Sequence, residues 1–407
     1  MVNQPTTSNY STQDHLTWAD TYGAHNYHPL PIVLERGDGI WVWDVEGKKY
    51  MDCLSSYSAV NQGHCHPRLI ETAKEQIEKI TLTSRAFHND QTGPFFKELS
   101  SICKKEMVLP MNSGAEAVET AIKTARKWGY TQKAVEEDKA EIIVFDNNFH
   151  GRTITIIGFS SEAQYRTGFG PFTPGFRLVP FGNLEAVRQA VNKNTVAILV
   201  EPIQGEAGVI VPPDGFLRGL RELSDAENIL LMADEIQTGL GRTGRMFASD
   251  HDGMVPDVYI LGKALSGGFY PVSAVVASRD VLGVFQPGDH GSTFGGNPLG
   301  CAVAREALNI LVEEKLTERA DELGNYFMGE LRDIHSPKVK EIRGKGLLIG
   351  VELKPEVGPA RPFCEKLMAE GMLCKETHES VIRFAPPLVI KKEEIDWALE
   401  RVRKVLE

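Results

Sequence analysis

The sequence predicts an α/β protein in which a large, doubly wound, mostly parallel sheet is joined to a smaller α+β domain. Two observations carry this prediction. Between residues 142 and 277, short apolar runs alternate with helical stretches, which is typical of parallel strands joined by crossover helices. The chain also has 407 residues, of which 42% are hydrophobic, so it is long enough to bury a large core or to form two domains.

The elements follow in order along the chain. Residues 40–50 predict a hairpin that turns at Glu46-Gly47, and a helix follows Pro67. Another helix begins after Ser113 and reaches about Tyr130. Apolar runs then predict strands at 142–145, 153–158, 196–200, 229–233, 258–261 and 272–277.

The remainder of the chain predicts the smaller domain. A long helical stretch runs from about residue 300 to 331, and an apolar run at 344–351 and further strands and helices follow it. We therefore expect three parts: an N-terminal segment that packs with the small domain (1–50), a large domain (51–300) and a C-terminal small domain (301–407).

Charge and cysteine usage exclude several classes of protein. The net charge of −11 argues against non-specific binding to nucleic acid or to an anionic membrane surface. No apolar stretch reaches the roughly 18 residues of a membrane helix, and the N-terminus resembles neither a secretory signal nor a transit peptide. The six cysteines are scattered, which predicts reduced thiols in a cytoplasmic protein. The run Gly63-His64-Cys65-His66 is too compact for its side chains to converge on one ion, so no metal is expected.

The most informative residue is Lys263. The apolar run 229–233 ends in Asp234-Glu235, and the later run 258–261 leads into Gly262-Lys263. One strand therefore ends in an acid and a later strand ends in a lysine, which is the pair that pyridoxal phosphate needs: a lysine amine for a Schiff base and a carboxylate for the ring nitrogen. A solvated surface lysine is the alternative. A phosphate loop is rejected, because Asp257 and Ala264 occupy positions where it needs Gly and Ser or Thr.

Other residues predict contacts to a ligand. Ser113-Gly114-Ala115 opens a helix whose free N–H groups could hold a phosphate, although taken alone the segment favours a simple helix cap at Ser113. Phe149 could stack on a flat ring and Arg152 could grip a carboxylate, with a loop aromatic and a surface arginine as the alternatives.

Two charged residues remain. Glu206 follows the strand 196–200, at the end of a parallel strand where ligands bind in such sheets, although a lone loop acid is usually just solvated. Arg383 interrupts the apolar stretch 381–387 and therefore needs a partner, either at the site or in a salt bridge at its rim.

Longer segments carry a family resemblance. In order, they are YGAHNYHPLP from Tyr22, LSSYSAVNQGHCHP from Leu54, LTSRAF from Leu82, VLPMNSGAEAVETA from Val108, NFHGRT from Asn148, EPIQGEAG from Glu201, ADEIQTGLGRTG from Ala233, LGKALSGG from Leu261, HGSTFGGNPLG from His290, RGKGLL from Arg343 and IRFAPPLVI from Ile382. They span nearly the whole chain, and together they resemble the class III, fold-type I, pyridoxal-phosphate-dependent aminotransferases.

The resemblance implies roles around the cofactor. Lys263 resembles the Schiff-base lysine and general base, Asp234 the partner of the ring nitrogen and Gln237 the donor to the ring 3-oxygen. Ser113, Gly114 and Ala115 would bind the phosphate and Phe149 would cover the ring. Ser292 and Thr293 would bind the cofactor too, and Thr293 would reach the phosphate of a neighbouring subunit, which implies a homodimer or larger oligomer. Ser113 stands where relatives often have Thr; both side chains carry a hydroxyl, so the expected phosphate contact is kept.

The resemblance also implies the substrates. The first two segments and the last point to members that act on ornithine, with 2-oxoglutarate as the amino acceptor. Tyr27 and Arg152 would hold the α-amine and α-carboxylate of ornithine, Tyr57 would shape the pocket, and Glu206 would pair with Arg383. Relatives that act on N-acetylornithine or 4-aminobutyrate are the alternative, but they typically carry an aliphatic residue in place of Tyr57. An aminomutase of the same fold and a non-catalytic binding protein are the remaining alternatives.

Overall fold

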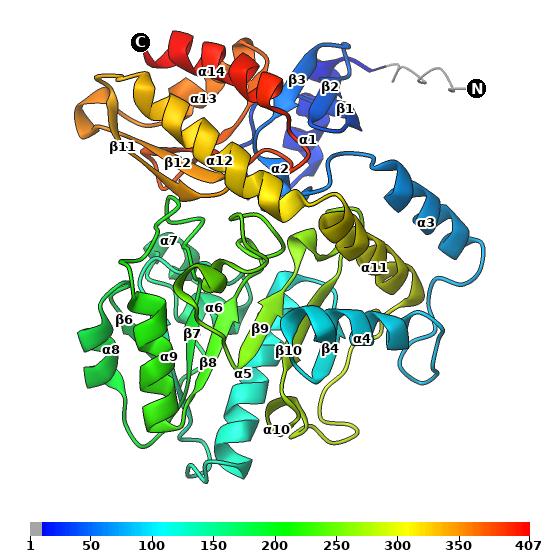
Figure 1. Ribbon diagram of the computed structural model, residues 1–407, viewed down its shortest axis with the longest axis vertical. Coiled ribbons are helices and arrows are strands. Elements are labelled where there is room, and N and C mark those ends of the chain that lie inside the picture. The colour runs from blue at the N-terminus through cyan, green and yellow to red at the C-terminus, as the bar shows by residue number, and fades with distance from the viewer. Residues whose placement is uncertain (1–9) are drawn as a thin grey trace.

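The computed structural model describes residues 10–407, and its elements form a large lower body and a smaller upper one (Figure 1). Residues 1–9, which belong to the expected N-terminal segment, lie outside the described range. No helix in the described range is both long and apolar enough to cross a membrane.

The lower body is built on a seven-stranded sheet. Its strand order is β4 (Met107–Met111), β10 (Ser273–Ala277), β9 (Val258–Leu261), β8 (Leu230–Asp234), β7 (Thr195–Val200), β5 (Glu141–Phe145) and β6 (Phe176–Val179). The neighbours from β9 to β6 are parallel, whereas β10 is antiparallel to both β4 and β9. The predicted mostly parallel sheet is therefore confirmed.

Helices cover both faces of this sheet, as its sequence requires. Successive side chains of a strand point to opposite faces. Ile142 and Val144 of β5 accordingly pack in one core cluster with Ala117 and Ala121 of α5 (Gly114–Thr131). The residue between them, Ile143, packs in another with apolar side chains of α9 (Phe216–Glu227). Burial on both faces explains why these strands are continuous apolar runs.

The upper body contains two smaller sheets. One joins β1 (Leu34–Asp38), β2 (Trp41–Asp44) and β3 (Lys49–Asp52) to the C-terminal strand β13 (Met372–Leu373). The other has the order β11 (Val339–Lys345), β12 (Leu348–Leu353), β15 (Val381–Phe384) and β14 (Lys375–Thr377). The helices α12 (Leu316–Asp333), α13 (Arg361–Ala369) and α14 (Lys392–Leu406) lie beside these sheets (Figure 1).

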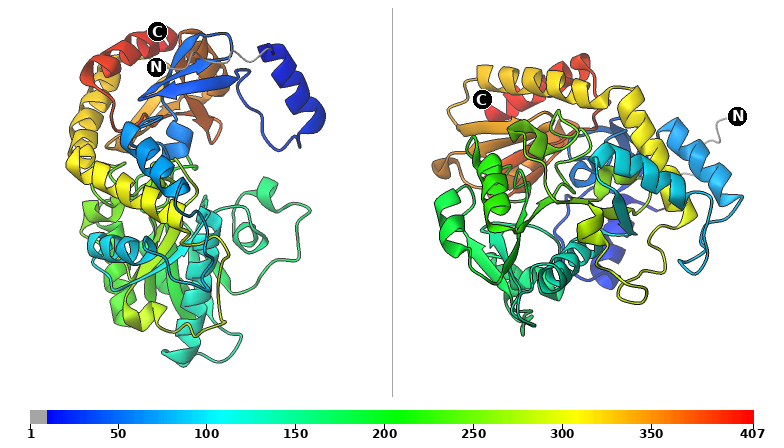
Figure 2. Two further views of the ribbon diagram at one scale, coloured as in Figure 1. Left: turned by 90° about the vertical axis from the view of Figure 1, so that its right-hand side faces the viewer. Right: turned by 60° about the horizontal axis from the view of Figure 1, so that its bottom comes forward.

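The N-terminal segment contacts the C-terminal part of the chain at several points. Strand β3 pairs in parallel with β13. Trp41 Nε1 donates to Glu394, and Arg361 Nη2 donates to the carbonyl of Pro29 (2.9 Å). By contrast, helix α1 (Thr12–Tyr22) has no buried residue and stands away from the body (Figure 2).

Two predicted elements differ in the structure. The run 153–158 is not a strand but the short helix α6 (Ile154–Gly158), which Thr153 caps by accepting from the amide of Ile156. Its β-branched residues favour a strand locally, but the helix is stabilised by burial of Ile156 and Ile157 in the core. The stretch from 300 to 331 is two helices, α11 (Pro298–Glu313) and α12, because Lys315 adopts a left-handed conformation (φ 53°). Strands β4 and β6 were not predicted.

The remaining helices connect these elements. They are α2 (Ser55–Ser58), α3 (Pro67–Ile77), α4 (Thr92–Cys103), α7 (Ala163–Arg166), α8 (Leu184–Ala190), α10 (Arg279–Leu282) and the short 3₁₀ helices η1 (Ala248–Asp252), η2 (Lys263–Ser266) and η3 (Pro355–Val357). The predicted hairpin over 40–50 is confirmed as β2 and β3, and the helix after Pro67 as α3.

Candidate active site

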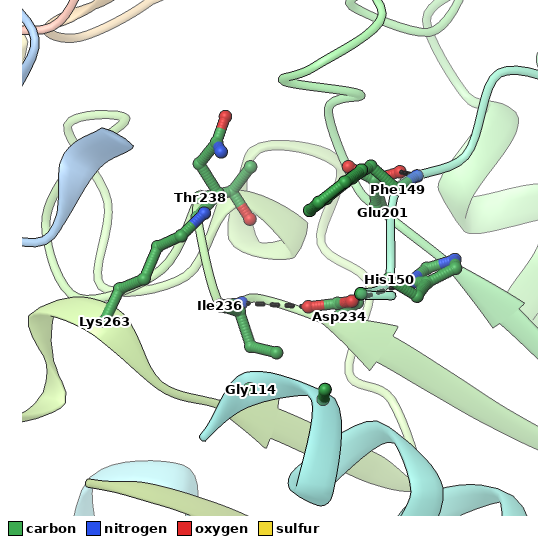
Figure 3. A pocket seen from close by; sticks show the side chains of 11 residues that line it. Gly114, Phe149, His150, Glu201, Asp234, Ile236, Thr238 and Lys263 are labelled. Atoms are coloured by element: carbon green, nitrogen blue, oxygen red, sulfur yellow. Dashed lines mark hydrogen bonds and ion pairs between the residues drawn. The ribbon is translucent and has the colours of Figure 1, made fainter. Parts of the chain in front are cut away.

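The predicted acid and lysine lie at the same edge of the large sheet. Strands β8 and β9 are adjacent and parallel, so their carboxyl ends coincide. Asp234 ends β8, and Lys263 follows β9 at the start of η2. Both side chains line one pocket of about 130 Å³, into which the Lys263 amine points (Figure 3). Lys263 has a φ of +43°, a conformation that costs energy for a residue with a side chain and recurs at functional sites.

The two adjacent acids at the end of β8 face different surroundings. Glu235 is buried and accepts hydrogen bonds from Thr238 Oγ1, Ser249 Oγ and the amides of Ala248 and Ser249. These four bonds occupy its oxygens in the protein interior. Asp234 is therefore the acid that the pocket can use.

Asp234 is held in place by a histidine. His150 Nδ1 donates to Asp234 Oδ2 (2.6 Å), and the amide of Ile236 donates to Oδ1 (3.1 Å) (Figure 3). Burial opposes a charged imidazole, but the hydrogen bond and the charge of Asp234 outweigh it and raise the pKa of His150. His150 thus fixes the position of the Asp234 carboxylate.

The Lys263 amine is poised to react. Within the described residues it makes no hydrogen bond and has no carboxylate within 4 Å. Burial lowers its pKa, with the positive charge of Arg383 acting in the same direction, although Glu206 and Asp234 oppose the shift. A lowered pKa increases the neutral fraction of an amine, which is the form that acts as nucleophile and base.

A second buried acid lines the pocket from β7. Glu201 accepts a hydrogen bond from the amide of Phe149 (2.8 Å) and so anchors the backbone of that aromatic residue. Burial and the negative charge of Asp234 raise the pKa of Glu201, whereas His150 lowers it, and together these effects bring the pKa to about 7.

The N-terminus of α5 forms the opposite wall. Gly114 and Ala115 line the pocket at the helix start, where backbone N–H groups have no partner within the helix and attract anions. Ser113 caps the helix instead: its Oγ accepts from the amide of Glu116 (3.3 Å), whose carboxylate accepts from the amide of Ser113 in return (2.7 Å). Ser292 Oγ accepts from Asn112 Nδ2 (2.9 Å), just before this helix.

A second cavity of about 570 Å³ adjoins the pocket and shares Phe149 with it. Arg152 is exposed at its wall and stacks over the ring of Tyr165 at 3.6 Å, with no carboxylate within 4 Å among residues 10–407. Tyr27 and Tyr57 border the same cavity. This cavity can therefore offer a ligand two phenols and a guanidinium whose charge no carboxylate among residues 10–407 balances.

Glu206, Arg383 and Gln237 form a network between the two cavities. Arg383 Nη1 donates to Glu206 Oε1 (2.6 Å) and to Gln237 Oε1 (3.3 Å), and Gln237 Nε2 donates to Glu206 Oε1 (3.0 Å). Burial alone would raise the pKa of Glu206, but the charges of Arg383 and Lys263 lower it to about 2. Arg383 is thus a buried cation paired with an ionised carboxylate.

The structure brings most of the predicted site residues together. Six line the pocket, namely Gly114, Ala115, Phe149, Asp234, Gln237 and Lys263. Tyr27, Tyr57, Arg152 and Glu206 line the adjoining cavity, and Arg383 joins it through Glu206. Ser113, Ser292 and Thr293 line neither cavity, and Thr293 is exposed.

Sequence reasoning gave no role to His150 or Glu201, although both stand in recognisable positions. Glu201 directly follows β7, and His150 lies in the loop that follows β5; both strands end at the same edge as β8. Their position at that edge is the signal that could have identified them.

The pocket fits pyridoxal phosphate. An ionised carboxylate, an unpaired lysine amine, helix N–H groups and an aromatic ring match its ring nitrogen, aldehyde, phosphate and ring face. The backbone is also shaped for this arrangement, because a Cβ at Gly205 would lie 1.7 Å from Gln237 Oε1. Glycine at that position lets Gln237 reach across the pocket.

The fold and the site define a class of enzyme. The chain belongs to the class-III aminotransferase family, which matches residues 22–406, and it is a pyridoxal-phosphate-dependent aminotransferase of fold type I. It is 60% identical to the ornithine aminotransferase of Geobacillus sp. (strain WCH70) over 394 residues, which cover 97% of this chain and 98% of that protein.

Solved structures agree on the fold. The ornithine aminotransferase of Toxoplasma gondii superposes with a TM-score of 0.96 at 47% identity, over 97% of this chain and 94% of that one. The acetylornithine aminotransferase of Elizabethkingia anophelis superposes with a TM-score of 0.88 at 46% identity, over 98% of this chain and 99% of that one. The predicted fold class and family are confirmed.

Proposed function

We propose that this protein transfers the δ-amino group of L-ornithine to 2-oxoglutarate. The products are L-glutamate and L-glutamate 5-semialdehyde, which cyclises to pyrroline-5-carboxylate. The observation that carries the proposal is a difference between two arginines at the substrate cavity. Among residues 10–407, Arg152 has no carboxylate partner, whereas Arg383 is neutralised by Glu206 at 2.6 Å. The high identity to ornithine aminotransferases supports it.

The two arginines account for the choice of amine. Ornithine carries its carboxylate far from the δ-amine, so Arg152 and Tyr27 at the cavity wall can hold the α-carboxylate and α-amine while the δ-amine reaches Lys263. With Arg383 neutralised by Glu206, its guanidinium does not compete with Arg152 for that carboxylate. 2-Oxoglutarate instead carries a carboxylate beside its reacting carbon, and Arg383 binds it once Glu206 moves away.

The protein's own groups then handle the protons. When bound, pyridoxal phosphate supplies an aldehyde that receives the amino group and a ring that withdraws electrons from the reacting carbon. Lys263 removes the proton from Cδ of ornithine. Asp234, positioned by its hydrogen bond with His150, would hold a proton at the ring nitrogen, and Phe149 would cover the ring face. Gly114 and Ala115 hold the phosphate, and Gln237 holds the ring oxygen.

N-acetylornithine is the second candidate donor, because the Elizabethkingia acetylornithine aminotransferase is 46% identical over almost the whole chain. Tyr57 favours ornithine. Its ring borders the cavity and lies 5.0 Å from the Arg383 guanidinium, where an aliphatic side chain would leave space for a longer or differently shaped donor. Dependence on 2-oxoglutarate separates both transferases from an aminomutase.

We further propose that the active form is a homodimer or larger oligomer in the cytoplasm, divided into the large and small domains given above. Thr293 is exposed, and so are the neighbouring Phe294 and, on a segment that lies against Gly296, Phe87. Exposed apolar residues at one place favour a protein interface. All six cysteines are free thiols, in keeping with a reducing compartment.

The deciding experiment compares amino donors. The purified holoenzyme is assayed with ornithine, N-acetylornithine and 4-aminobutyrate, each with 2-oxoglutarate, and pyrroline-5-carboxylate is trapped. We expect the highest kcat/KM with ornithine and no turnover without 2-oxoglutarate. A higher kcat/KM with N-acetylornithine, or more than one equivalent of product per active site without the oxo acid, would replace the proposal by its rivals.

A further inference from the structure

A left-handed turn carries Tyr57 into the substrate cavity. Ser55, Ser56, Tyr57 and Ser58 have φ values of +49°, +50°, +62° and +69°, and none of them is glycine. A left-handed conformation costs a residue with a Cβ roughly 1–2 kcal/mol, so such residues normally occur singly. Four in succession persist only where the surroundings hold them in place.

Asp52, at the end of β3, is the polar anchor of this turn. Its Oδ1 accepts from the amides of Leu54 (2.9 Å) and Ser55 (2.8 Å), and its Oδ2 lies 2.7 Å from His64 Nε2. Asp52 is only 8% exposed. His64 is itself fixed through its backbone, which exchanges two hydrogen bonds with Gly39.

Within the turn, the amides of Ser58 and Ala59 also donate to the carbonyls of Leu54 (3.2 Å) and Ser55 (2.8 Å). The hydroxyls of Ser55 and Ser58 are buried without a hydrogen-bond partner. A further cavity of about 450 Å³, which Ser56 and Tyr57 line, lies beside the turn and is distinct from the substrate cavity in most of its lining. Tyr57 therefore borders empty space into which it could move if the turn relaxed, and close packing does not fix its position.

We propose that Asp52 is a positioning residue that sets substrate preference by capping the left-handed turn and so fixing Tyr57 in the substrate cavity. This inference rests on the proposed function only in taking ornithine as the preferred donor. Asp52 touches neither of the two substrate arginines, so it acts through Tyr57. Its loss lets Tyr57 leave the cavity, and the consequence resembles truncation of Tyr57 itself.

The test is a double-mutant cycle. The ratio of kcat/KM for ornithine to that for 4-aminobutyrate is measured for wild type, Asp52→Ala, Tyr57→Ile and the double variant, with cofactor content and the thermal midpoint recorded for each. We expect Asp52→Ala and Tyr57→Ile each to lower the ratio about tenfold, since one pocket contact is worth roughly 10–200-fold in discrimination. The double variant should show no further fall, because both changes remove the same interaction.

Asp44 provides a matched control. It is also buried, its Oδ1 also accepts from two amides, those of Glu46 and Lys48, and its Oδ2 accepts from Tyr50. It caps the β2–β3 hairpin, however, and lines neither cavity. Asp44→Ala should lower the thermal midpoint without changing the ratio by more than about twofold. Asp52→Asn keeps the oxygen that accepts both amides and should keep the ratio near wild type.

The outcomes separate the two proposals. A wild-type enzyme that does not prefer ornithine overturns the proposed function, whatever Asp52 does. If wild type prefers ornithine and Tyr57→Ile lowers the ratio, an unchanged ratio in Asp52→Ala, or additive losses in the double variant, overturns the role of Asp52. If Asp52→Ala yields no folded protein, His64→Ala replaces it, and the ratio of the two kcat/KM values is expected to fall about threefold. An unchanged ratio in His64→Ala would also overturn the role of Asp52. A crystal structure of the variant should show positive φ lost at Ser56 and Tyr57.

Discussion

Replacing Glu206 by alanine is expected to shift the preference between amino donors from ornithine toward glutamate by roughly 10–100-fold. Glu206 is the only carboxylate within 4 Å of Arg383 among residues 10–407, and the Arg383 side chain is 1% exposed. Its removal leaves a buried cation with only the neutral Gln237 as acceptor and no carboxylate to balance its charge. The α-carboxylate of glutamate can then bind Arg383 in place of Glu206. The α-carboxylate of ornithine can bind there too, which would hold ornithine with its δ-amine away from the reacting position.

The magnitude follows from the contacts. The pKa of Glu206 falls from its ordinary value of 4.5 to about 2, which at 1.36 kcal/mol per unit corresponds to about 3 kcal/mol of net stabilisation of the carboxylate. Arg383 shares this effect with Lys263, so the pair itself is worth about 1.5–3 kcal/mol as a charge-assisted hydrogen bond. Each 1.4 kcal/mol is a factor of about ten, which gives the expected range.

The assay is a single turnover of the holoenzyme with one donor at a time. The change in absorbance of the bound cofactor is followed after mixing with ornithine or glutamate, and the ratio of the two rate constants is compared between wild type and Glu206→Ala. Analysis of the products should also show ornithine beginning to react through its α-amine.

Two variants serve as controls. Glu206→Gln keeps an acceptor for Arg383 without the charge and should give a smaller shift. Glu376 lines the same cavity but pairs with Arg361 and Lys375, so Glu376→Ala tests the loss of an acid that is not bonded to Arg383. The reasoning fails if Glu206→Ala gives no relative gain for glutamate, or if Glu376→Ala gives the same gain.

Four further predictions follow from the site. Lys263→Ala should fold but lose at least about a thousandfold in turnover, whereas Lys105→Ala, which removes another lysine whose pKa burial lowers, should not; steady-state rates decide this. Tyr57→Ile should raise kcat/KM for 4-aminobutyrate relative to ornithine, and an unchanged ratio would contradict the role of the phenol. Thr293→Ala should weaken cofactor binding, and sedimentation with activity measurements should find no fully active monomer. The pKa of Glu201 is raised from 4.5 to about 7, chiefly by burial, so the folded protein binds this proton more tightly than the unfolded chain does. The resulting contribution to the free energy of unfolding is complete below pH 4.5 and is lost as pH rises through 7. Glu201→Gln should therefore remove up to about 3 kcal/mol of pH dependence from urea unfolding measured between pH 4.5 and 8.

The large sheet and the position of Lys263 and Asp234 could be predicted from the sequence because their signals are local. A run such as Leu230–Asp234 is apolar on both faces, which only a covered parallel strand requires, and its terminal acid must lie at the sheet edge. The next predicted strand, β9, is also its neighbour in the sheet. Local pattern and tertiary arrangement therefore agree at this part of the site.

The elements that could not be predicted depend on contacts distant in sequence. The run 153–158 has the composition of a strand, yet it forms α6. Ser55–Ser58 contains neither glycine nor asparagine, so nothing local indicates four left-handed residues; the amide contacts to Asp52 and the Asp52–His64 bond stabilise them. The alternative roles left open for Arg383 likewise depended on its partner, which lies 177 residues earlier in the chain.

Gln237 connects the two halves of the proposed reaction. It lines the cofactor pocket, and it also donates to Glu206 and accepts from Arg383. In the proposed mechanism, Gln237 would remain as a neutral acceptor for the buried guanidinium after Glu206 leaves Arg383. The cation would then keep a hydrogen bond until a substrate carboxylate arrives. A neutral acceptor lowers the free-energy cost of the state in which Glu206 has left Arg383. Unlike a second carboxylate, it would not compete with the substrate carboxylate for the charge of Arg383. This arrangement allows one cavity to accept ornithine at its δ-amine and 2-oxoglutarate at its α-carbon.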